Sequence, residues 1–141
     1  MKILLAVDGS SYSRKAAEYL TSHLNWLQTA PELYVLHVKL PIPLGRARGG
    51  MTQEAIDHYY ESEAMEALAP AEQVLRAHNI PFESTFKVSD IAEGILSYVT
   101  EKGIDLVVMG SHGHGAIGNL VTGSITTKVL AITTVPVLIV R

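Results

Sequence analysis

The sequence predicts an α/β fold, a doubly wound five-stranded parallel sheet with helices on both faces. Short apolar runs and longer amphipathic stretches alternate along the chain, an order that gives parallel strands joined by right-handed helical crossovers. Turn residues bound the apolar runs, as in strands that are buried on both faces. The 141 residues are enough for one hydrophobic core, so we expect a single domain over residues 1–141.

The first strand and the first helix flank a turn-rich segment. Residues 3–7 are a short apolar run that ends at Asp8 and Gly9, which indicates a buried strand. Apolar side chains then recur at steps of three and four residues over residues 13–27. This spacing places them on one face of a helix.

A second strand and a long helical segment follow. Residues 33–38 repeat the apolar strand pattern, and the glycine-rich stretch at residues 44–50 predicts a loop. Helical composition then extends over residues 52–78. Pro70 lacks a backbone N–H, so it should kink or divide this helix. One bent helix and two shorter helices agree equally well with the sequence.

The second half of the chain continues the alternation. Residues 82–88 predict a third strand, and the pair Ser89-Asp90 offers an N-cap for a helix over residues 91–102 that Gly103 ends. The remaining elements are a strand, a glycine-rich loop, a helix and a last strand, at residues 105–109, 110–118, 119–132 and 135–140.

The turn-rich strand ends predict the order of the sheet. In doubly wound sheets a ligand binds beyond the carboxyl ends of two neighbouring strands, at the point where the winding reverses. The turn-rich ends here follow the first and the fourth strands. Placing these two strands side by side gives the order 3-2-1-4-5.

Composition excludes several functions. The net charge is −3, which makes a nucleic-acid partner unexpected because such proteins gather positive charge. The absence of cysteine excludes disulfides and thiolate metal sites. No apolar run is long enough for a membrane span. The run at residues 3–7 is also shorter than the roughly 7–15 apolar residues of a secretory signal, so we expect a cytoplasmic protein.

The strongest motif is glycine-rich. Residues 109–115 read MGSHGHG and lead to Gly123 and Ser124. Glycines let a backbone approach an anion closely, and the amides at the start of the next helix favour phosphate. These residues therefore predict a phosphate cradle, although glycines at such a place can also simply form a tight loop.

The spacing from Gly110 through Gly113 to Gly123 and Ser124 resembles the nucleotide-binding signature of the ATP-binding universal stress proteins. Residues 6–10 (AVDGS) resemble the end of the first strand of these proteins, and residues 135–141 (VPVLIVR) are similar to their ending. The resemblance covers essentially the whole chain. It implies a Rossmann-like fold of the adenine nucleotide alpha hydrolase type and a role in stress responses.

The resemblance also implies roles at the nucleoside end of a bound nucleotide. Asp8 would contact the nucleoside, and the backbone of Val38 would meet the adenine edge. Met109 and Gly110 would lie against the ribose.

At the other end, the resemblance implies that Gly113, Gly123 and Ser124 would hold phosphate, with His112 close to it. Mg²⁺ could bridge the phosphate oxygens of ATP, ADP or AMP.

One departure from the family affects the phosphate end. Relatives often carry an arginine shortly after the second glycine, whereas this chain has His114 there and Asn119 further along. No lysine or arginine occurs between Gly110 and Thr127. Phosphate binding would then depend on main-chain amides and the helix dipole. We therefore expect AMP or ADP to bind as well as ATP.

Two side-chain types also have simpler interpretations. An aspartate before Gly-Ser often caps the following turn, so Asp8 could either cap this turn or bind the nucleoside. His112 and His114 lack a third metal ligand in the sequence, and we expect no histidine-held metal.

The last strand predicts a partner. In the order 3-2-1-4-5 it is an edge strand, yet the segment from Val135 to Val140 is apolar, which is unusual for an exposed edge. Pairing with a second copy around a two-fold axis would cover both edges, and the resemblance implies such a homodimer.

Three functions remain open on the sequence. The first is a homodimeric module that senses or sequesters adenine nucleotide. The second is a slow ATPase or phosphotransferase, which would need a positioned base. No catalytic residue is assigned. The third is an interaction protein with no bound nucleotide.

Overall fold

Five strands form one parallel sheet in the computed structural model, which describes residues 1–43, 45, 49–114 and 122–141. Their order is β3-β2-β1-β4-β5, as predicted. Leu5 in the middle of β1 pairs with Val35 of β2 on one side and with Val108 of β4 on the other. The strands are Lys2–Val7, Glu32–Lys39, Glu83–Val88, Leu106–Gly110 and Val137–Val140 for β1 to β5.

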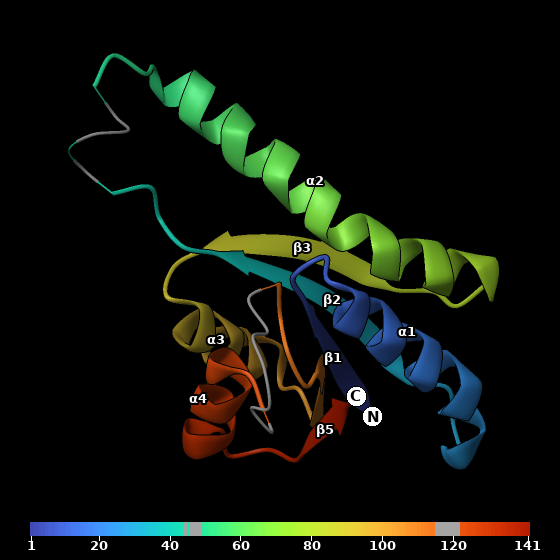
Figure 1. Ribbon diagram of the computed structural model, residues 1–141. Helices are drawn as coiled ribbons and strands as arrows, with labels where there is room; N and C mark the ends of the chain where they lie inside the picture. The colour runs from blue at the N-terminus through green and yellow to red at the C-terminus, as the bar shows by residue number, and fades with distance from the viewer. Residues whose placement is uncertain (44, 46–48, 115–121) are drawn as a thin grey trace.

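Helices cover both faces of the sheet (Figure 1). On one face, α1 (Ser11–His23) and α2 (Gln53–Ala77) pack over a buried core that includes Leu5 and Val35. On the other face, α3 (Ile91–Lys102) and α4 (Ser124–Ile132) pack over a second core. The alternation of the strand side chains thus fills two separate cores, as expected for a sheet buried on both sides.

The expected ends of α3 are confirmed. The carboxylate of Asp90 accepts a hydrogen bond from the main-chain N–H of Glu93, and the helix ends at Gly103, which has a φ of +65°. Both are standard ways to satisfy the free backbone groups at helix ends.

The second helix is continuous through Pro70, which decides between the two alternatives that the sequence left open. Proline removes one helical hydrogen bond. Buried side chains on both sides of it, including Leu68 and Ala71, hold the two halves of α2 on the sheet. Packing therefore outweighs the local preference of the proline.

Two helices are shorter than predicted. The first ends at His23 and continues as a short 3₁₀ turn at Leu24–Trp26. The last begins at Ser124 rather than at Asn119, and residues 119–121 lie outside the described residues. Gly123 is extended, with a φ of −67° and a ψ of 156°, and its N–H bonds to the carbonyl of Ser111 instead of joining the helix.

In the part of the chain that the structure describes, every helix is too short or too polar to cross a membrane.

Candidate functional site

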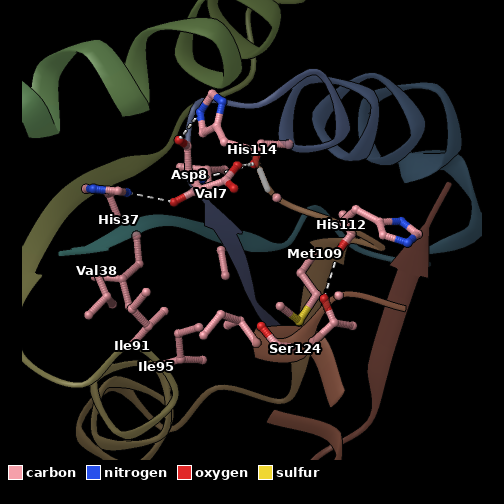
Figure 2. A pocket seen from close by; sticks show the side chains of 18 of the residues that line it. Val7, Asp8, His37, Val38, Ile91, Ile95, Met109, His112, His114 and Ser124 are labelled. Carbon is pink, nitrogen blue, oxygen red and sulfur yellow. Dashed lines mark hydrogen bonds between the residues drawn. The ribbon is translucent and has the colours of Figure 1, made fainter. Parts of the chain in front are cut away.

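A cavity of about 530 Å³ lies where β1, β2 and β4 end and α3 and α4 begin. This is the edge of the sheet at which doubly wound folds bind ligands. All the residues that the sequence assigns to a nucleotide line it, and Figure 2 shows the cavity from close by. They are Asp8, Val38, Met109, Gly110, His112, Gly113, Gly123 and Ser124.

Asp8 is held in place by the start of α1. Its Oδ1 accepts hydrogen bonds from the N–H of Ser10 at 2.9 Å and from the hydroxyl of Ser13 at 2.7 Å. The Ser13 hydroxyl in turn accepts from the N–H of Asp8 at 3.0 Å. Burial raises the pKa of the Asp8 carboxyl, but the hydrogen bonds from Ser10 and Ser13 outweigh this and hold the pKa below its ordinary value.

The second oxygen of Asp8 faces the glycine-rich segment. A Cβ added at residue 113 would lie 2.5 Å from Asp8 Oδ2, so glycine is required for this close approach. The next residue, His114, donates from Nε2 to the main-chain oxygen of Asp8 at 2.9 Å. Contacts across the cavity therefore join the end of β1 to the segment after β4.

The first turn of α4 is tied to the end of β4. The N–H of Gly123 bonds to the Ser111 carbonyl at 2.7 Å, and the buried hydroxyl of Thr126 donates to the Gly110 carbonyl at 3.1 Å. Because Gly123 and Ser124 line the cavity, the N-terminus of α4 borders it. The free amides there carry partial positive charge that favours an anion.

An apolar wall completes the cavity, and sequence reasoning missed most of it. Its side chains come from the ends of β2 and β4, from the first two turns of α3 and from the first turn of α4, and they are Leu36, Val38, Ile91, Ile95, Met109 and Ile125. In the sequence these positions match ordinary core residues. The predicted topology could have indicated this wall. A helix that follows a parallel strand begins near the carboxyl end of that strand, which is the edge of the sheet where ligands bind.

The two histidines of the motif point differently. His114 lies beside Asp8, whereas Figure 2 shows the His112 ring directed away from Val38, Ile91 and Ile95. That ring packs against Tyr12 with centroids 5.2 Å apart. The predicted place of His112 near phosphate therefore remains a prediction. Gly115, Gly118 and Asn119 of the predicted loop and helix lie outside the described residues.

A third histidine borders the cavity from β2. The Nδ1 atom of the buried His37 donates to the carbonyl of Val7 at 2.9 Å, which ties the ends of β1 and β2 together. The described residues contain no group of three or more acidic or histidine side chains that could hold a metal ion.

The sequence profile of the universal stress protein family matches residues 1–141, and the chain belongs to this family. It is 31% identical to universal stress protein YxiE of Bacillus subtilis, in an alignment that covers 99% of this chain and 98% of that protein. It is 32% identical to a universal stress protein of Thermus aquaticus over 99% of this chain and 97% of that protein.

Solved structures share the fold. UspA from Lactobacillus plantarum matches with a TM-score of 0.81 and 18% identity, over 100% of this chain and 97% of that chain. An Archaeoglobus fulgidus universal stress protein in complex with dAMP matches with 0.68 and 22%, over 100% and 98%. An Arabidopsis thaliana family member with AMP bound matches with 0.68 and 15%, over 99% and 90%.

Proposed function

We propose that this chain binds an adenine nucleotide in the cavity at the ends of β1 and β4, and that it acts as a homodimeric sensor or interaction module in a stress response. One observation carries the proposal. An apolar wall, an ionised carboxylate and a helix N-terminus border a single cavity of about 530 Å³. These surfaces match an adenine ring, the hydroxyls of a ribose and a phosphate.

The proposal divides the lining between the two ends of the ligand. The nucleoside end takes Asp8, the backbone of Val38, Met109 and Gly110, and the phosphate end takes the first turn of α4 with Gly113, Gly123 and Ser124. The complexes of the Archaeoglobus and Arabidopsis proteins with dAMP and AMP support an adenine monophosphate as one ligand.

Charge determines which nucleotide is favoured. Lys39 lines the cavity, but its ammonium is 2.6 Å from a carboxylate oxygen of Glu63, and Asp8 adds a negative charge. The described lining thus offers little positive charge for a triphosphate, and each added phosphate gains little attraction. We expect AMP and ADP to bind as tightly as ATP, with Mg²⁺ assisting the longer phosphate chains.

Calorimetric titration of nucleotide-free protein with AMP, ADP and ATP, each with and without Mg²⁺, tests this function. The expected result is saturable binding of all three with dissociation constants within about tenfold of one another, because the two phosphates that distinguish ATP from AMP together contribute less than ~1.4 kcal/mol. GTP, which differs from ATP only in its base, is the control for recognition of adenine. The absence of heat at millimolar nucleotide would reject the proposal in favour of an interaction protein that binds no nucleotide.

Product analysis of the ATP sample separates a binding module from an enzyme. The binding module leaves ATP intact over hours. Steady release of orthophosphate that is lost in His112→Ala or Gly113→Ala protein would instead establish a slow ATPase or phosphotransferase.

The homodimer is proposed because the edge strand β5 leaves apolar side chains partly exposed. Strand β5 ends the sheet in the described residues, and its apolar side chains Val137, Leu138 and Ile139 are only half-buried. A cavity of about 410 Å³ lined by Tyr19 and Leu138 lies at this strand. Light scattering should give twice the chain mass of 15.3 kDa, and a mass equal to one chain would refute the dimer.

A further inference from the structure

The proposed function does not explain why the side chain of Ser13 is hydrogen-bonded to Asp8. Ser13 is buried, with an exposed fraction of 4%, and its hydroxyl is part of the lining of the cavity. It lies in the first turn of α1, whereas Asp8 lies before the helix begins. Their contact therefore links the first helix to the end of β1.

The Ser13 hydroxyl makes two hydrogen bonds to the same residue. It donates to Asp8 Oδ1 at 2.7 Å and accepts from the N–H of Asp8 at 3.0 Å. The hydroxyl thereby fixes both the backbone and the carboxylate of Asp8. Ser13 is itself held by the helix cap, because its N–H donates to the Ser10 hydroxyl at 3.3 Å.

The two oxygens of Asp8 consequently have different surroundings. Oδ1 accepts from Ser10 and Ser13 on the protein side. Oδ2 points toward Gly113 and takes no hydrogen bond from the residues that the structure describes. The capping and binding interpretations of Asp8 thus apply to different oxygens of the same carboxylate.

We propose that Ser13 is a positioning residue of the nucleotide site, which acts through Asp8 by occupying Oδ1 and presenting Oδ2 as the acceptor for a ligand hydroxyl or amino group. This inference rests on the proposed function. A free carboxylate could rotate and offer either oxygen, whereas the paired hydrogen bonds select one orientation before the ligand arrives. Such preorganisation strengthens binding because less ordering is needed at the moment of association.

The ionisation of Asp8 gives a readout that a purely structural role for Ser13 would not change. The hydrogen bonds from Ser10 and Ser13 lower the pKa of Asp8 against the effect of burial, and the nearby His114 lowers it further. His114 bonds to the main-chain oxygen of Asp8, and His37 bonds to the neighbouring Val7 carbonyl. Lys39 and His112 are the other titratable groups of the described lining. Removing the Ser13 hydroxyl should raise the pKa of Asp8.

The sign of the pH effect follows. Asp8 must be ionised to accept from the ligand, so binding is present above its pKa and is lost as the pH falls through it. In Ser13→Ala protein this loss should begin at a higher pH than in the wild type. At neutral pH we expect AMP and adenosine to bind about tenfold more weakly, because both lose the same oriented acceptor.

The experiment combines calorimetry with a carbon NMR titration of the Asp8 carboxyl in ligand-free protein. Ser11→Ala is the matched control, because Ser11 is an exposed residue of the same helix turn. A circular dichroism melt shows that each variant is folded. If Ser13→Ala does not fold, Ser13→Cys, which has a similar shape and a weaker donor, takes its place.

A raised Asp8 pKa together with a parallel loss of AMP and adenosine affinity in Ser13→Ala supports the proposal. A folded variant with unchanged Asp8 titration and unchanged affinities overturns it. If the wild type binds no nucleotide, the proposed function fails. The NMR titration would still decide, without any ligand, whether Ser13 controls the carboxylate.

Discussion

Replacement of Gly113 by alanine is expected to weaken AMP binding about 100-fold while leaving the protein folded. The new Cβ would lie 2.5 Å from Asp8 Oδ2, closer than two such atoms can approach. The Asp8 carboxylate must then turn away, and the oxygen that faces the cavity is lost as an acceptor. A 100-fold change equals about 2.7 kcal/mol of binding free energy, which is within the range for a hydrogen bond to a charged group.

Calorimetry with AMP measures this effect, and Gly49→Ala is its control. The Gly49→Ala substitution is the same chemical change at a position where the added Cβ meets no atom within 4 Å. Its affinity for AMP should equal that of the wild type. A folded Gly113→Ala protein that binds AMP within threefold of the wild type would show that the Asp8 and Gly113 contact does not form part of the site.

The second large effect concerns stability. Gly9→Ala is expected to lower the free energy of unfolding by roughly 2–5 kcal/mol, measured by urea denaturation. Gly9 has a φ of +82°, and an added Cβ would lie 2.9 Å from the Cα of Ala67 in α2. Both the backbone conformation and the packing of α2 against this turn therefore oppose a side chain.

Gly103→Ala separates these two causes. Gly103 has a φ of +65°, but a Cβ there meets no atom within 4 Å. Its replacement should cost only the conformational part, about 1–2 kcal/mol. Equal losses in the two variants would contradict the packing of α2 on the Gly9 turn.

The sheet could be predicted because its determinants are local. Apolar runs identified the strands, and the turn-rich ends of residues 3–7 and 105–109 were enough to place β1 beside β4. The glycine motif and Asp8 then lay at one edge of the sheet, so all the assigned residues line the same cavity. Composition and spacing carry this information without long-range contacts.

Other features depend on tertiary contacts and could not be predicted. The start of α4 is set by a hydrogen bond from the N–H of Gly123 to the carbonyl of Ser111, which directly follows β4. The continuity of α2 through Pro70 comes from packing on the sheet. The apolar wall from Ile91 and Ile95 looks like ordinary core in the sequence, because nothing in its pattern distinguishes a side chain that lines a cavity.

The orientation of the Asp8 carboxylate could not be predicted from the sequence either, because it also depends on tertiary contacts. The residues around it indicated either a cap or a ligand contact, and only the positions of Ser13 and Gly113 show that its two oxygens have different surroundings.

The central claim is that an adenine nucleotide occupies the cavity at the ends of β1 and β4. The most direct test is an amide NMR titration of nucleotide-free protein with AMP. The expected result is a set of saturable shifts concentrated at Asp8, Gly113, Gly123 and Ser124, with small changes along α2 and β3. Shifts confined to other surfaces, or no shifts at millimolar AMP, would contradict it.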